Sequence, residues 1–219
     1  MTYTLRFYVD FLREFMGEMG MGKVTLVGNC VGSAISLRYA IESPESVERL
    51  VLFNILTQQT VRDGILGPFF KLTAPAPALR PLLRSVFGGM RLPGIVGRYS
   101  VAKQYGRRSA RDPQLYAELS ALYGRKGLVR ALADILVDID SFDVLDDFSI
   151  KEGFPPTFVL WGGDNNVLPC PAGRRLVETL GPKKFEVIEG AGHLVMHEAA
   201  PEVNALIENF FAQNRVQGS

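Results

Sequence analysis

The sequence has 219 residues, of which 47% are hydrophobic and 21% are charged, a balance typical of one globular domain with or without an insertion. The formal net charge of +1 gives no electrostatic indication of nucleic acid or of a strongly charged partner surface. The two cysteines, Cys30 and Cys170, show neither metal-site spacing nor a disulfide framework, and no apolar run is long enough to span a membrane.

Residues 3–19 are predicted to form an amphipathic helix, because apolar residues recur there at steps of three and four. Phe7 and Phe11 widen the apolar stripe, so we expect this helix to be covered on more than one side. Charged residues interrupt the segment, which is therefore not a signal peptide. Together with the low cysteine count, this indicates a cytoplasmic protein, on the condition that no N-terminal signal has been lost.

The next stretch predicts a strand, a sharp turn and a helix. The apolar run 23–27 is followed by Gly-Asn-Cys-Val-Gly at 28–32, and then by helical spacing up to Glu42. A nucleophilic side chain at the apex of such a turn is typical of a nucleophile elbow. We expect the glycine on each side to permit the tight turn, and the helix N-terminus to favour a Cys30 thiolate.

The remaining chain predicts three more strands and a long helical insertion. The predicted strands are 50–53, 157–161 and 184–188, and the predicted helices are 114–123, 128–139, 171–180 and 201–211. Residues 56–151 contain no convincing strand and therefore read as a helical insertion between two strands of one sheet. Several of its side chains either line a pocket or form a solvated face, namely Tyr99, Lys103, Tyr105, Arg107 and Arg108.

Two groups of polar residues follow predicted strands directly. Asp164 and Asn165 follow the strand 157–161, and His193 lies in a glycine-rich loop after the strand 184–188. In a parallel sheet, the loops after the carboxyl ends of the strands share one edge, where sites form. We therefore expect these residues to lie close to Cys30. A thiol, an imidazole that exchanges its proton and a third group that orients the imidazole are the requirements of nucleophilic catalysis.

With these segments in this order, the chain resembles the α/β-hydrolase superfamily. The resemblance rests on 24–32, 43–52, 156–169 and 190–203. It implies a mostly parallel α/β sheet flanked by helices, with a core at 1–56 and 151–212, a helical lid at 57–150 and a tail at 213–219. It also implies that the N-terminal strands of the family are missing. No cofactor or metal is expected, and the substrate is expected to be a small molecule.

The resemblance implies a hydrolase or acyltransferase in which Cys30 attacks an ester or thioester carbonyl. His193 would be the base and then the acid, and the Val31 N–H would hold the oxyanion. In the family's pattern, the position of the catalytic acid corresponds to Asn165, and asparagine there suits a Cys-His-Asn arrangement. Asp164, one residue earlier, is a competing assignment, and in a third alternative both residues only shape a turn. An inactive relative that binds a small molecule or a partner chain is the alternative function.

The strand that precedes Cys30 has a continuous apolar pattern that suits the centre of a sheet. Without further strands it would lie at an edge, and exposed apolar edges promote aggregation. Two explanations stay open. Either the sequence is truncated, or a homodimer or a partner chain covers the edge.

Overall fold

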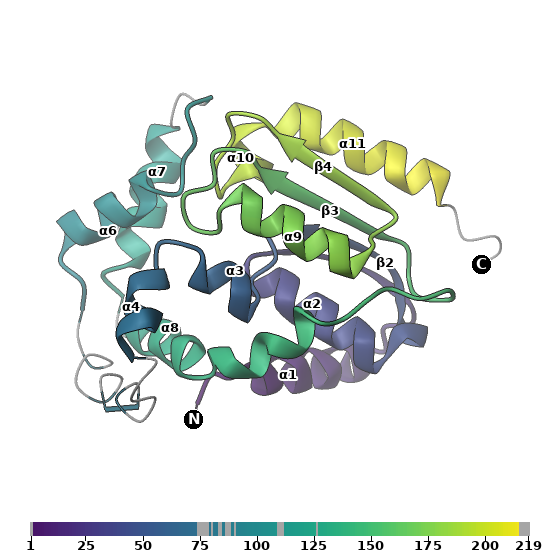
Figure 1. The fold of residues 1–219 in the computed structure, drawn as a ribbon, viewed down its shortest axis with the longest axis horizontal. Coiled ribbons are helices and arrows are strands. Elements are labelled where there is room, and N and C mark those ends of the chain that lie inside the picture. The colour runs from purple at the N-terminus through teal and green to yellow at the C-terminus, as the bar shows by residue number, and fades with distance from the viewer. Residues whose placement is uncertain are drawn as a thin grey trace.

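The computed structural model describes residues 2–73, 79, 81–82, 85, 89, 91–108, 112–125 and 127–214. Its strands form one parallel sheet in the order β1-β2-β3-β4. The strands are β1 Val24–Asn29, β2 Val47–Phe53, β3 Thr157–Gly162 and β4 Lys184–Ile188. The prediction of a parallel α/β sheet, including all four strand positions, is confirmed (Figure 1).

Helices connect these strands. Those of the core are α1 Leu5–Glu18, α2 Val31–Glu42, the short 3-10 helix η1 Pro44–Ser46, α9 Cys170–Leu180, α10 Val195–Glu198 and α11 Ala200–Gln213. Those between β2 and β3 are α3 Gln58–Arg62, α4 Gly67–Thr73, α6 Gly94–Ala102, α7 Pro113–Leu122, α8 Leu128–Val137 and the 3-10 helix η2 Ile139–Leu145. The last residues of the predicted tail, 215–219, lie outside the described residues.

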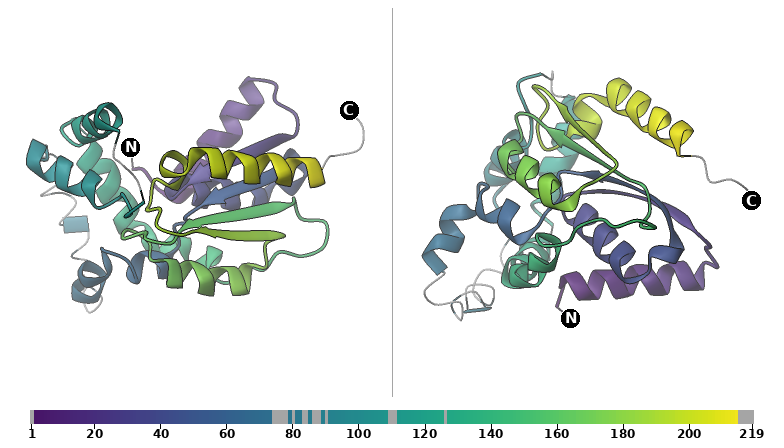
Figure 2. Two further views of the ribbon diagram at one scale, coloured as in Figure 1. Left: turned by 90° about the horizontal axis from the view of Figure 1, so that it is seen from above. Right: turned by 45° about the vertical axis from the view of Figure 1, so that its right-hand side comes forward.

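The sheet is the middle layer of three. Successive side chains of a strand point to opposite faces, so β2 and β3 each supply two cores. One core contains Leu50, Leu52, Val159 and Trp161, together with side chains of α1, α2 and α9. The other contains Val51, Phe53, Phe158 and Leu160, packed against α11. The right view in Figure 2 shows α11 and α1 on opposite sides of the strands. Burial on both faces explains why these strands read as continuous apolar runs.

Within the described part of the chain, helix α1 buries a single face. Leu5, Val9 and Met16 are buried, but Phe11 is 60% exposed and Phe15 is 46% exposed. The expectation that this helix is covered on more than one side is therefore wrong for this structure. Thr4 begins the helix by accepting a hydrogen bond from the Phe7 backbone N–H, an N-cap that the apolar spacing alone does not reveal.

The helical insertion lies at the carboxyl ends of the strands. Figure 1 shows the arrowheads of β3 and β4 pointing toward α6, α7 and α10. Helices α7 and α8 match the predicted helices within a few residues, and the described part of the insertion contains no strand. Some of its prolines, at 75 and 77, lie outside the described residues. The insertion is therefore placed beside the edge of the sheet where the candidate residues were expected.

Candidate active site

Cys30 occupies a strained position between β1 and α2. Its φ of 55° and ψ of −114° are rare for a residue with a side chain. Three backbone hydrogen bonds hold this conformation. The Cys30 N–H donates to the Phe53 carbonyl at 3.0 Å, and the Cys30 carbonyl accepts from Ala34 at 3.1 Å and Leu56 at 3.3 Å. The turn therefore fixes Cys30 at the apex between the sheet and the helix.

The two glycines of the turn differ in their importance. A Cβ at Gly28 would lie 2.5 Å from the carbonyl carbon and oxygen of Gly32, which is too close for any side chain. A Cβ at Gly32 would meet no atom within 4 Å. The expectation that both glycines are needed is therefore correct for Gly28 and wrong for Gly32. The buried hydroxyl of Ser33 lies 2.7 Å from the Gly28 carbonyl and 2.8 Å from the Phe53 carbonyl, and so ties the helix to both strands.

The Cys30 sulfur is a neutral thiol at pH 7. Burial raises its pKa to about 12, and a hydrogen bond from the Val31 N–H opposes that rise only in part. Burial therefore outweighs the expected effect of the helix N-terminus on the pKa of Cys30. The Val31 N–H does lie at the Cys30 sulfur.

His193 lies on the loop after β4 and is 5% exposed. Its backbone N–H donates to the Gln104 carbonyl of the insertion at 2.7 Å, and its own carbonyl accepts from Asn54 at 3.1 Å. Burial lowers the pKa of its ring to about 4, so that the imidazole is neutral at pH 7. The hydrogen bonds of the described residues include none between the His193 ring and Cys30.

Asn165 is the residue that contacts the His193 ring. Its side-chain nitrogen lies 3.1 Å from Nδ1 of His193. Its side-chain oxygen accepts hydrogen bonds from the backbone N–H groups of Val167 and Leu168, at 2.9 and 3.0 Å. The structure thus brings together His193 and Asn165 beside the elbow, as the chain order suggested.

Asp164 lies against the insertion instead. Its carboxylate accepts hydrogen bonds from Nε of Arg107 at 2.6 Å and from Nη2 at 3.0 Å. Arg107 accordingly lowers the pKa of Asp164. The geometry therefore does not place Asp164 as the group that orients His193, and its carboxylate joins the loop after β3 to the insertion.

Residues of the insertion lie against the candidate site, and two of them were not expected from the sequence. Gln104 donates a hydrogen bond to the Tyr123 hydroxyl at 2.9 Å. Burial raises the pKa of Tyr123, and the nearby Cys30 sulfur adds to that rise, which places this phenol within electrostatic range of the elbow. No motif marks Gln104 or Tyr123 in the sequence. Their positions depend on how the insertion folds back over the sheet.

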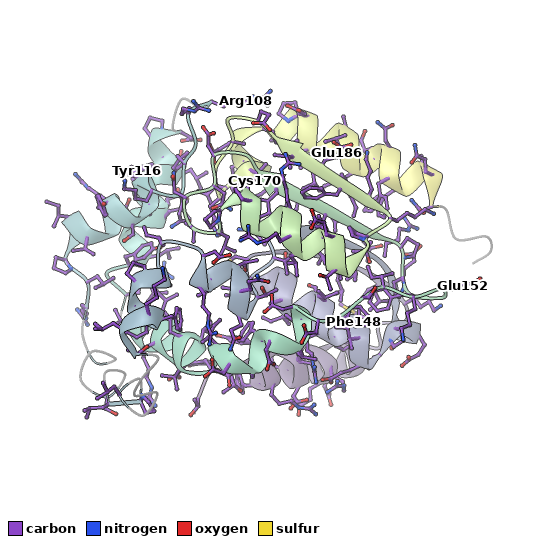
Figure 3. The ribbon with its side chains drawn as sticks, viewed as in Figure 1. Arg108, Tyr116, Phe148, Glu152, Cys170 and Glu186 are labelled. Carbon is purple, nitrogen blue, oxygen red and sulfur yellow. The ribbon has the colours of Figure 1, made fainter. Side chains whose placement is uncertain are left out.

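A pocket of about 440 Å³ opens beside Asn165, lined in part by Tyr105, Arg107, Asp164 and Cys170. Figure 3 labels Cys170 at the start of α9, and Arg108 and Tyr116 on the insertion. Tyr105 is buried, whereas Tyr99 is 61% exposed. Tyr105 thus lines a pocket, as one alternative for these residues predicted, whereas Tyr99 lies on a solvated face, as the other predicted.

The described residues include no cluster of three or more histidine, cysteine and acidic side chains suited to a metal ion. Nor does the described part of the chain contain a helix with the length and apolar character required to cross a bilayer.

A family model for the alpha/beta hydrolase fold matches residues 2–200. An uncharacterized protein of Mycobacterium tuberculosis is 24% identical over 216 residues, which cover 95% of this chain and 61% of that relative. This chain thus spans less than two-thirds of the length of that relative. The 2-hydroxy-6-oxo-2,4-heptadienoate hydrolase of Pseudomonas putida is 26% identical over 218 residues, which cover 96% of this chain and 71% of the relative.

Among solved structures, a thermophilic esterase from Thermogutta terrifontis shares the fold with a TM-score of 0.73 at 19% identity. The match covers 99% of this chain and 75% of the esterase. The parallel sheet flanked by helices agrees with these matches. Because the family model matches most of its length, the chain belongs to the α/β-hydrolase family.

Proposed function

We propose that this chain carries an acyl-transfer or hydrolase site in which Cys30 attacks the carbonyl of a small ester or thioester. The observation that supports this most directly is the backbone of Cys30. A strained φ of 55° holds a thiol at the turn before α2, with the Val31 N–H at the sulfur. Strain of this kind persists only where the surrounding structure imposes it, and it concentrates at functional sites.

The reaction would proceed in two stages, acylation and then deacylation of Cys30. The Cys30 sulfur forms a bond to the carbonyl carbon while the thiol proton passes to His193, and the Val31 N–H donates to the oxyanion. The bond from the carbonyl carbon to the leaving oxygen or sulfur then breaks, and His193 returns the proton to the leaving group. Water or a second acceptor then forms a bond to the acyl carbon while its proton passes to His193. The bond from that carbon to the Cys30 sulfur breaks, the acid or the acylated acceptor leaves, and His193 returns the proton to the thiol. Asn165 orients the His193 ring in this scheme.

The relatives support a carbonyl substrate. The Pseudomonas putida relative is named as a hydrolase of a 2-hydroxy-6-oxo acid, and the structural neighbour from Thermogutta terrifontis is an esterase.

We propose that residues 57–150 act as a lid that sets substrate choice, because Gln104 and Tyr123 of this segment lie over the site. The core of the fold would then be 1–56 and 151–212. A reducing compartment such as the cytoplasm would keep Cys30 and Cys170 as free thiols.

The test is covalent labelling of the thiol in the full chain. An activated acetyl ester or thioester is expected to leave an acetyl group on Cys30, located by mass spectrometry of the digested protein. Cys30→Ala should abolish both the label and any turnover, while the control Cys170→Ala should keep both. Label on Cys170 alone, with turnover unchanged in Cys30→Ala, would contradict the proposal.

One observation favours a second candidate, a relative that binds a small molecule without turning it over. The thiol and the imidazole are both neutral at pH 7, and the hydrogen bonds found among the described residues include none between them. In that case Cys30→Ala would leave ligand binding by a carbonyl compound intact in a thermal-shift assay, and no acyl-cysteine would form in the wild type.

We further propose that a second copy of the chain or a partner chain covers β1. This strand lies at the edge of the described sheet, and the outward-facing Val27 is 57% exposed. An exposed apolar edge strand is a template for pairing with another chain.

A further inference from the structure

The side chain of Asn54 has one orientation, because backbone groups fix both of its ends. Its oxygen accepts a hydrogen bond from the Gly162 N–H at 3.1 Å, and its nitrogen donates to the His193 carbonyl at 3.1 Å. A backbone N–H can only donate and a carbonyl can only accept, so a rotated amide would lose both bonds. Asn54 itself has a φ of 44°, a conformation that asparagine tolerates better than most residues.

The orientation of Asn165 follows from the same reasoning. Its oxygen is the acceptor for the N–H groups of Val167 and Leu168. Its nitrogen lies 2.9 Å from the Asn54 oxygen, whose position is already fixed. Rotating the Asn165 amide would break the two backbone bonds and set two oxygens against each other. The group that Asn165 presents to His193 is therefore its NH₂.

The direction of this hydrogen bond determines where the His193 proton lies. The Asn165 NH₂ is 3.1 Å from Nδ1 of the ring and can only donate, so Nδ1 must offer its lone pair. A neutral imidazole has one ring proton, and that proton must then be on Nε2. The lowered pKa of His193 agrees with a ring that stays neutral at pH 7.

From these contacts we infer that Asn54 is a positioning residue that, through the Asn165 amide, holds the proton of His193 on Nε2. The two bonds span 111 and 28 residues of sequence and connect the loops after β2, β3 and β4. The Asn54 nitrogen also donates to the Asn29 side chain at 3.0 Å, directly before Cys30. One network thus runs from the elbow to the ring of His193.

The consequence for the reaction rests on the proposed function. A ring that already has its proton on Nε2 cannot accept the Cys30 proton there. To do so, it must first carry its proton on Nδ1, where that N–H would face the N–H of Asn165. The resting site is therefore unfavourable for deprotonation of Cys30. Asn54 maintains this state, because its oxygen is a partner for an amide at position 165 and would repel a carboxylate.

The direct test is nitrogen NMR of the full-length wild-type protein, since protonated and unprotonated ring nitrogens have well-separated chemical shifts. The chain has only two histidines, and His197→Gln assigns the signals of His193. The expected result at pH 7 is a protonated Nε2 and an unprotonated Nδ1. A protonated Nδ1 would overturn the inference whether or not Cys30 can be acylated. Absence of acylation on Cys30, with Nε2 protonated, would reject the proposed function and leave the inference intact.

Variants test the role of Asn54. Asn165→Asp should move the ring proton to Nδ1, raise the His193 pKa and speed acylation of Cys30 by on the order of tenfold or more. Asn166→Asp is the matched control, because it adds the same charge at an exposed neighbouring position.

Adding Asn54→Gly to Asn165→Asp should raise the His193 pKa further. The double variant removes the Asn54 side-chain oxygen that would repel the new carboxylate, and glycine accepts the positive φ at position 54. An equal His193 pKa in the single and double variants, both folded by circular dichroism, would refute the assignment of Asn54.

Discussion

Burial of His193 links the protonation of one ring to the stability of the fold. The ring has a pKa of about 4 in the folded protein, against 6.5 for an exposed histidine. As the pH falls from 7 toward 5, the unfolded chain takes up a proton at this position and the folded protein does not. Acid therefore favours unfolding, and the protein is more stable above pH 6.5 than below it.

We predict that this residue lowers the free energy of unfolding by about 2 kcal/mol between pH 7 and pH 5. Other groups also titrate in this range, so the measurement is a comparison. Urea unfolding of the wild type and His193→Gln at both pH values should show a smaller loss in the variant, because glutamine does not titrate. Equal losses in the two proteins would show that the ring is not neutral in the folded state.

The turn between β1 and α2 is organised at the scale of elements. Gly28 is the next-to-last residue of β1, which passes within contact distance of the start of α2, whereas Gly32 lies inside the helix facing open space. The same type of residue therefore has different roles four positions apart. At position 28 it permits the approach of two backbones, and at position 32 it only lowers helix propensity.

Gly28→Ala is predicted to destabilise the fold by on the order of 2 kcal/mol or more, because its Cβ would force the strand and helix apart. Gly32→Ala should be neutral or stabilising by about 0.5–1 kcal/mol, as expected for alanine in a helix. Thermal unfolding followed by circular dichroism separates the two. Similar losses for both variants would show that the turn needs glycine on both sides.

The elements were predictable because their signals are local. The apolar runs of β2 and β3 and the periodicity of α7 depend on neighbouring residues, so the sequence alone predicts their position and type. The chain order of the site led to Asp164 and Asn165 together, and the resemblance to the α/β-hydrolase superfamily favoured Asn165. Neither the direction of its amide nor the thiol state of Cys30 could be predicted. The amide direction depends on Asn54, 111 residues away, and the thiol pKa depends on burial by the whole fold.

At the scale of the whole molecule, the sheet has two different edges. The β4 edge strand is half-buried and carries charged residues, including Lys184 and Glu186, which discourage pairing. The β1 edge exposes Val27, and the nearby α1 exposes Phe11 and Phe15. This asymmetry explains why association through β1 is expected rather than association through β4.

Val27→Lys is predicted to weaken association of the purified chain, because a lysine on an edge strand opposes strand pairing. Sedimentation at several protein concentrations measures this. Leu72→Lys is the matched control, since Leu72 is 77% exposed on α4, away from the strand edge. If both variants associate as the wild type does, the β1 edge is not the interface.

If the proposed function holds, the hydrogen bond between the His193 N–H and the Gln104 carbonyl also constrains how substrate can enter. A segment that opened as an independent flap would leave the catalytic groups unchanged beneath it. Here, lifting the segment around Gln104 releases the backbone of His193 at the same time. Under the proposed function, admission of a substrate and placement of the imidazole would therefore be coupled, and the ring would be fully positioned only with residues 57–150 closed over the site.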